Sequence, residues 1–204
     1  MGLLNKEGTS ISAPSPDVEF RIDKTKDIPI LPDFSNKREI DVKYPLLSPH
    51  AYAHIHWDEN EKEVMYEIIE PPLNENEKKI LTSLEKGIEE LINISFINIK
   101  EESAVISYLE KNAKVLLSEL GIKLPRDVFM KLMYYIYRDF VGLNKIEAMM
   151  HDYYIEDIEC NGVNTPLYIV HRKYRNLKTN VTFKTTSNLT SFVEKLAQKC
   201  GKYI

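Results

Sequence analysis

The stretch Tyr153–Phe183, YYIEDIECNGVNTPLYIVHRKYRNLKTNVTF, decides what the sequence predicts for the fold. Two strand-like runs, Ile155–Cys160 and Leu167–Tyr174, are separated by a connection that begins with Asn-Gly, and a third run, Thr179–Phe183, follows a polar bend. Asn-Gly tolerates the positive φ that tight turns require, whereas Tyr, Ile and Val favour the pleated surface of a sheet. The stretch therefore predicts a small antiparallel β-meander.

A run of cationic side chains, His171 to Arg175, ends the middle strand of this meander. A loop that is held by a sheet is a useful position for a group that binds an anion. Two interpretations stay open at this point, because a polar strand end can equally well do no more than solvate its charges.

Three motifs resemble the N-terminal domain of archaeal type II/IV secretion ATPases, and most closely the ATPases that assemble and rotate the archaellum, the archaeal flagellum. They are the acidic turn Glu156-Asp157-Ile158, the strand end from His171 to Arg175, and the pair Thr179-Asn180. The resemblance is strongest over residues 120–204. It implies a hexameric, type IV pilus-like motor in which this domain moves against a RecA-like core, with ATP and Mg²⁺ bound by the full-length parent protein.

The resemblance also implies roles for individual residues. Basic residues of such a domain approach the nucleotide phosphates, and the candidates here are Arg172, Arg175 and Arg138. A guanidinium group suits this role because it stays protonated and can donate two parallel hydrogen bonds. Which arginine reaches the phosphate stays open. Three further residues are expected in structural or interdomain contacts: Asp157, His171 and Asn180.

The catalytic core itself is not expected within this sequence. A phosphate-binding loop needs a Gly-rich turn that is closed by Gly-Lys-Ser/Thr, and the one Gly-Lys pair, Gly201-Lys202, is followed by Tyr203. We therefore expect the chain alone to be neither an enzyme nor a cofactor-binding protein. The partners implied are its own ATPase core, neighbouring subunits of a hexamer, a membrane platform protein and cytoplasmic accessory proteins of the archaellum motor.

Composition narrows the remaining function classes. A net charge of −4 argues against general affinity for nucleic acid, which requires a basic excess. Cys160 and Cys200 lack metal-type spacing and fit reduced thiols of a cytosolic protein. No apolar run reaches the roughly 18 to 20 residues of a membrane-spanning helix. We expect a cytoplasmic protein that associates peripherally with the inner face of the cell membrane.

Residues 1–37 are polar and punctuated by proline, so they are predicted to form a flexible tail. Within them Val18, Phe20 and Ile22 alternate with charged residues, as in a segment that docks on a partner as an added strand. The alternative is a tether that only improves solubility.

Residues 38–142 are predicted to form a β-hairpin followed by a three-helix bundle. The hairpin consists of Tyr52–Trp57 and Glu63–Ile69, and the helices cover about 75–94, 101–120 and 125–141. The third helix carries Tyr and Met nearly all round, so it is either central in the domain or covered by another surface.

Two histidines of the hairpin, His54 and His56, lie on the same side of a predicted strand, with His50 nearby. Neutral imidazoles two residues apart are able to start a metal site. Because the sequence identifies no third or fourth ligand, we predict no metal site and a solvated strand face.

Residues 143–204 are predicted to be an α+β subdomain in which a helix from Ser187 to Gly201 packs on the meander and leads toward the absent core. The predicted fold class is therefore α+β: a tail, a hairpin with a helical bundle, and a small antiparallel sheet with a C-terminal helix. The alternative function is a stand-alone, non-catalytic adaptor that binds partners through its tail and its Tyr/Met-rich helix.

Overall fold

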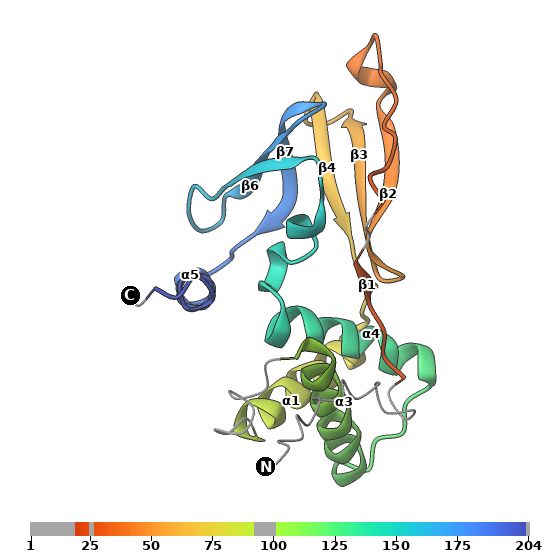
Figure 1. Ribbon diagram of the computed structural model, residues 1–204, viewed down its shortest axis with the longest axis vertical. Helices are drawn as coiled ribbons and strands as arrows, with labels where there is room; N and C mark the ends of the chain where they lie inside the picture. The colour runs from red at the N-terminus through yellow and green to blue at the C-terminus, as the bar shows by residue number, and fades with distance from the viewer. Residues whose placement is uncertain (1–18, 25–26, 92–100, 203–204) are drawn as a thin grey trace, which may run out of the picture.

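A seven-stranded sheet runs through the molecule, with a helical bundle at one end and a separate helix beside its far edge (Figure 1). The structure is a computed structural model that describes residues 19–24, 27–91 and 101–202. The strand order is β1-β2-β3-β4-β7-β6-β5. The strands are β1 (Asp23–Lys24), β2 (Asp41–Ser48), β3 (Ala51–Asp58), β4 (Glu63–Ile69), β5 (Ile155–Glu159), β6 (Pro166–His171) and β7 (Arg175–Thr182). The predicted α+β class is confirmed.

The helices lie between and after these strands. The longer ones are α1 (Glu75–Leu91), α3 (Glu102–Glu119), α4 (Arg126–Ile136) and α5 (Thr186–Lys199). The short turns are η1 (Lys37–Glu39), η2 (Tyr137–Val141), η3 (Asn144–Ile146) and η4 (Met149–His151). None of the described helices combines the length and the apolar character needed to cross a membrane.

Strands β2, β3 and β4 form the antiparallel half of the sheet nearest the N-terminus. The alternation predicted for the hairpin is confirmed, because Ala51, Ala53 and Ile55 of β3 are fully buried and the residues between them are not. Strand β2 was not predicted. Its sequence contains Pro45, where the register of its pairing with β3 shifts, so local pattern alone gives a weak strand signal.

A parallel contact between β4 and β7 joins the hairpin half to the meander half. Met65 and Tyr66 lie opposite Lys178 and Thr179. Beside this short ladder, the Asn180 amide accepts a hydrogen bond from Ile68 N and donates one to Ile68 O, each at 3.0 Å. The sequence predicts two separate β units within 38–142 and 143–204, whereas the structure unites them in one sheet.

The three predicted helices form a bundle below the sheet, as Figure 1 shows. Helix α1 begins with a capping box, in which Asn74 Oδ1 accepts from Glu77 N and Glu77 Oε2 accepts from Asn74 N, both at 2.9 Å. The Tyr/Met-rich helix α4 is central: Met133, Tyr134 and Tyr137 at its end are buried. These three side chains offer little surface to a partner, whereas Met130 and Tyr135 of the same helix are only partly buried, and the adaptor hypothesis stays a prediction.

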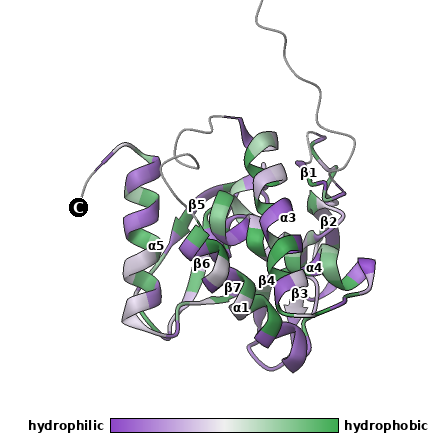
Figure 2. Cartoon of the chain, turned by 90° about the horizontal axis from the view of Figure 1, so that it is seen from below, coloured by the Kyte–Doolittle hydropathy of each residue, from purple (hydrophilic) through white to green (hydrophobic). Residues whose placement is uncertain are grey.

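Helix α5 stands apart from the bundle, and its polar and apolar faces are visible in Figure 2. Its N-cap is Thr185, whose hydroxyl oxygen accepts from Asn188 N at 3.2 Å, and not the predicted Ser187. Of its apolar stripe only Phe192 is buried. The predicted packing of this helix with the small sheet is confirmed: Phe192 stacks on Phe183, just after β7, and Leu189 and Leu196 are partly buried against the core. The same stripe also faces a groove described below.

The described part of the predicted tail is packed on the domain from Glu19 onward. Phe20 is 1% exposed and its ring stacks on His50 at 5.3 Å between centroids. The buried carboxylate of Glu110 accepts hydrogen bonds from the backbone N–H groups of Glu19 and Phe20, both at 3.0 Å. Composition averaged over 37 residues does not reveal a single buried side chain such as Phe20. The free energy gained by burying that ring offsets the conformational entropy lost when the chain around it is ordered. Val18 and the residues before it lie outside the described ranges, and Ile22 is partly buried against the core.

Candidate functional site

A buried carboxylate, Asp152, connects the two halves of the sheet beneath the β6–β7 turn. Its Oδ2 accepts hydrogen bonds from the hydroxyls of Tyr44 on β2 and Tyr66 on β4, at 2.6 and 2.7 Å. Its Oδ1 accepts from Tyr154 N at 2.9 Å. Burial is the main reason that the pKa of each tyrosine hydroxyl lies above its usual range, and the charge of Asp152 raises the pKa further. Both hydroxyls therefore stay protonated and donate. The partners of Asp152 are 86 and 108 residues away in the sequence, so no local pattern identifies them.

The His171 ring is the core of the β6–β7 turn and is 1% exposed. It lies between the rings of Tyr154 and Tyr174, nearly parallel to both, at 5.3 and 5.1 Å. Its Nδ1 accepts from the backbone N–H groups of Lys173 and Tyr174, at 3.2 and 3.1 Å. Nδ1 is therefore unprotonated, and burial lowers the pKa of the imidazole to about 4. A neutral histidine thus fixes the backbone of the turn.

Two other residues of the cationic run are held by the segment before β2. The Lys173 ammonium donates to the carbonyl of Leu31 and forms an ion pair with Asp33 at 2.9 Å. The Tyr174 hydroxyl donates to the carbonyl of Pro32 at 2.9 Å. Three of the five residues from His171 to Arg175, namely His171, Lys173 and Tyr174, therefore make their contacts inside the domain.

The remaining two residues, Arg172 and Arg175, leave the same turn toward solvent. The Arg172 side chain is 44% exposed; its Nε lies 3.5 Å from Glu156 Oε1, and its guanidinium lies 4.6 Å from the ring centroid of Tyr153. Arg175 is exposed, adopts φ +65°, and forms no ion pair with any residue that the structure describes. The structure therefore leaves two guanidinium groups accessible on one rigid hairpin end.

Arg138, the third predicted candidate, is committed to contacts inside the domain. Its side chain is 12% exposed and donates to both oxygens of Glu70, at 3.0 and 2.8 Å, and to both oxygens of Asp139. Burial lowers the pKa of this guanidinium, but the bonds to Asp139 and Glu70 outweigh that effect and raise the pKa above its usual range. Its hydrogen-bond donors are therefore engaged within the domain, which makes it a poorer phosphate contact than Arg172 or Arg175, and its role at a nucleotide stays a prediction.

The predicted structural residues Asp157, His171 and Asn180 lie in different parts of the sheet. Asp157 Oδ1 accepts from Ile158 N at 2.9 Å and its side chain lies at the wall of a groove. His171 and Asn180 make the contacts described above within the domain. Interdomain roles for all three stay predictions.

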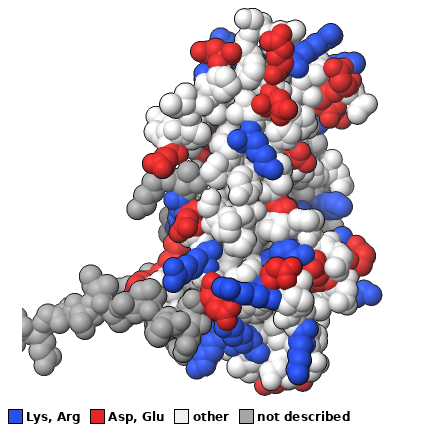
Figure 3. Space-filling model, turned by 90° about the vertical axis from the view of Figure 1, so that its right-hand side faces the viewer, with Lys and Arg blue, Asp and Glu red and all other residues white. Residues whose placement is uncertain are grey.

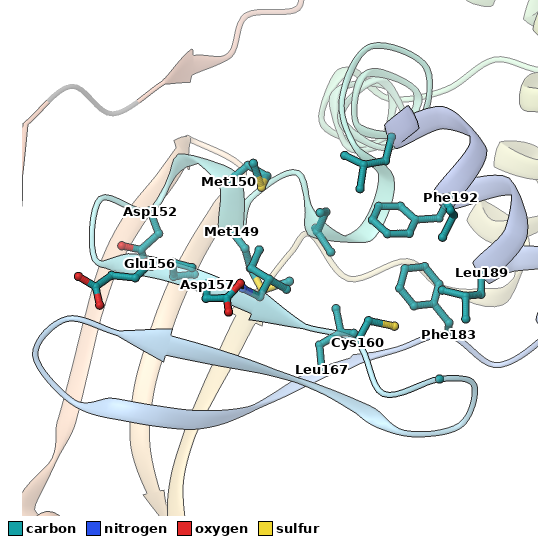
Figure 4. A pocket seen from close by; sticks show the side chains of 16 residues that line it. Met149, Met150, Asp152, Glu156, Asp157, Cys160, Leu167, Phe183, Leu189 and Phe192 are labelled. Atoms are coloured by element: carbon teal, nitrogen blue, oxygen red, sulfur yellow. The ribbon is translucent and has the colours of Figure 1, made fainter. Parts of the chain in front are cut away.

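The groove itself lies between α5 and strand β5, the edge of the sheet, and has a volume of about 610 Å³. Its lining is mainly apolar, with Met149, Leu167 and Leu189 among the residues labelled in Figure 4. At one end Phe183 and Phe192 stack, with ring centroids 4.9 Å apart. Leu189, Val193 and Leu196 of α5 line this groove, which the periodicity of the helix alone does not predict.

Comparison with known proteins gives relatives without a stated activity. No family model matches the chain. It is 38% identical over 148 residues to the uncharacterized protein MJ1288 of Methanocaldococcus jannaschii, a match that covers 72% of this chain and 58% of that protein. It is 30% identical over 81 residues to the uncharacterized protein MJ0900 of the same organism, a match that covers 40% of this chain and 14% of that protein. The chain thus matches less than two thirds of the length of either relative.

On the face seen in Figure 3, Lys and Arg side chains are interspersed with Asp and Glu. A protein that binds nucleic acid non-specifically usually presents a basic stripe or patch. The mixed charge of this face does not resemble such a footprint, and the exclusion of nucleic acid stays a prediction.

Proposed function

We propose that this chain is the N-terminal oligomerisation and regulatory domain of a hexameric secretion ATPase that powers archaellum assembly and rotation. The observation that supports this function best is the pair Arg172 and Arg175, both accessible on a turn whose backbone is fixed by His171. One of the three motifs that resemble secretion ATPases, the strand end from His171 to Arg175, forms this turn. The match that covers 14% of MJ0900 also suits a module that occurs within longer proteins.

In this proposal the two arginines supply positive charge to a nucleotide bound by the adjacent core. A guanidinium group is permanently charged and forms paired hydrogen bonds with phosphate oxygens. Because the turn is already ordered, little conformational entropy is lost when the core closes on it. ATP and Mg²⁺ belong to the core, and this domain contributes no catalytic base and no nucleophile.

The groove between α5 and β5 is assigned, in the same proposal, to contact with the core or with a neighbouring subunit. An apolar surface of this size next to an unpaired strand edge is suited to association with another protein surface. Contacts with the membrane platform and the accessory proteins of the motor would place the hexamer at the inner face of the membrane.

The test uses the complete protein that carries both this domain and a nucleotide-binding core. We expect Arg172→Ala or Arg175→Ala to lower kcat for ATP hydrolysis at least ~10-fold while KM stays within about threefold, as for a group that acts on the transition state. Arg126→Ala is the matched control, because Arg126 is also an exposed arginine and lies in the bundle. Unchanged turnover in both turn variants would remove the phosphate role.

A non-catalytic adaptor is the second candidate, favoured by the apolar groove. Such an adaptor would bind its partner at the α5–β5 groove, since Met133, Tyr134 and Tyr137 are buried. The coding sequence after Ile204 discriminates between the two functions. A phosphate-binding loop within the next hundred or so codons supports the ATPase, and a stop codon supports the adaptor.

A further inference from the structure

Three neighbouring strands bring two histidines and two carboxylates together on one face of the sheet. His54 and His56 lie on the same side of β3. In the antiparallel register Glu67 of β4 is opposite His54, and Asp41 of β2 is opposite His56. The cross-strand carboxylate, Glu67, is the third ligand that the sequence did not reveal, because only the strand register places it beside the histidines.

The side chains of this cluster approach one another closely. One ligand atom each from His54, His56 and Glu67 can be chosen so that all three lie within 4.8 Å of one another. His54 Nδ1 is 3.8 Å from Glu67 Oε2, and the two imidazole rings stack with centroids 4.4 Å apart. In a tetrahedral Zn²⁺ site with bonds of about 2.0–2.2 Å, ligand atoms are roughly 3.3–3.6 Å apart. Small side-chain rotations would therefore bring these atoms to bonding distance.

Asp41 fixes the tautomer that such a site needs. Its Oδ1 lies 2.7 Å from His54 Nε2 and can only accept, so Nε2 carries a proton and Nδ1, 3.8 Å from Glu67 Oε2, is the nitrogen left to bind a metal. A carboxylate behind a ligating histidine is the usual way in which proteins orient that ligand. Asp41 is thus a positioning residue and not a ligand.

His56 provides a second, independent indication. Its Nδ1 is buried and has no hydrogen-bond partner among the residues that the structure describes. Buried polar atoms are nearly always satisfied, and one without a partner calls for a missing group. A cation held at this nitrogen, in the plane of the ring, would supply that partner.

We propose that His54, His56 and Glu67 bind one divalent transition-metal ion of the Zn²⁺ type, with Asp41 orienting His54. Two imidazole nitrogens favour Zn²⁺ and similar ions over Mg²⁺ or Ca²⁺, which prefer oxygen ligands. With three protein ligands, a fourth position stays open to water or to a group from a partner. The ion would link β3 to β4 directly and β2 through Asp41.

The test is a calorimetric titration of the tag-free, EDTA-treated chain with ZnCl₂. We expect saturable binding of one ion per chain, a rise in melting temperature that EDTA reverses, and a visible absorption band of tetrahedral type when Co²⁺ replaces Zn²⁺. Glu67→Gln and His56→Gln should each weaken binding at least ~10-fold, and Asp41→Asn ~10- to 100-fold.

The matched control is Glu63→Gln. Glu63 is on the same side of β4 as Glu67 but four residues away, opposite Asp58. The Glu63→Gln variant should therefore bind Zn²⁺ with an affinity within about twofold of the wild-type value. The proposal is overturned if the wild-type chain shows no saturable 1:1 binding, or if Glu67→Gln binds Zn²⁺ as tightly as Glu63→Gln does. In either case the cluster consists of ordinary ion pairs between the histidines and their neighbouring carboxylates.

Discussion

Asp152 is predicted to contribute more to stability than any exposed carboxylate of this domain, and Asp152→Ala tests this directly. The substitution removes the acceptor for the hydroxyls of Tyr44 and Tyr66 and for the backbone N–H of Tyr154. A buried donor left without a partner costs about 1–3 kcal/mol. Since two hydroxyls are deeply buried and the N–H is closer to solvent, we expect a loss of about 3–5 kcal/mol in the free energy of unfolding.

A double-mutant cycle separates the hydrogen bond from other effects of the substitution. Tyr66→Phe alone leaves Asp152 with two donors and should cost about 1–2 kcal/mol. In the Asp152→Ala background the same change removes an unpaired hydroxyl, so its cost should fall to near zero. The predicted coupling energy is therefore about 1–2 kcal/mol, within the range for groups in contact.

Urea-induced unfolding, followed by circular dichroism, measures all four proteins of the cycle. Asp157→Ala is the control: its carboxylate is exposed and, among the described residues, accepts a hydrogen bond only from its neighbour's N–H, so a change within about 0.5 kcal/mol is expected. If Asp152→Ala lost less than 1 kcal/mol, or if the two changes were additive, the buried network would not hold the two halves of the sheet together as argued above.

Three further outcomes follow from the fold. Phe20→Ala should lower the free energy of unfolding by about 3–5 kcal/mol, as expected for a buried ring, and a melting temperature equal to wild type would show that the segment is not part of the core. Asn180→Ala should cost about 1–2 kcal/mol in urea unfolding through its two bonds to Ile68, and a smaller loss would mean that the β4–β7 ladder alone joins the sheet. The folded-state pKa of His171, about 4, lies below its ordinary 6.5, so its contribution to stability is lost as pH falls from 6.5 toward 4, by up to about 1.4 kcal/mol per pH unit. Its imidazole NMR signal should not titrate above pH 5, and a midpoint near 6.5 would contradict the burial of the ring.

Local sequence patterns predicted the elements that are determined by residues close together in the chain. The capping box of Asn74 and Glu77 placed the start of α1, and Asn161-Gly162 indicated the end of β5, with Gly162 at φ +115°. Tyr and Met around α4 indicated a central helix, and its buried side chains confirm this.

The features that the sequence did not predict all depend on partners far along the chain. The burial of Asp152 depends on hydroxyls 86 and 108 residues away, and Phe20 is held by a glutamate 90 residues away. Arg138, the weaker of the three arginine candidates, pairs with Glu70, which is 68 residues away. Periodicity carries no information about such pairs, because it describes only neighbours on one element.

The parallel junction between β4 and β7 has a consequence for synthesis on the ribosome. Ile68 and Asn180 are 112 residues apart, so the hairpin half emerges long before its partner strand exists. During that interval β4 presents an open edge to other nascent chains, and closing the sheet must await a slow, non-local encounter. A chaperone that shields this edge, or a pause in translation after β4, would govern the yield of native protein.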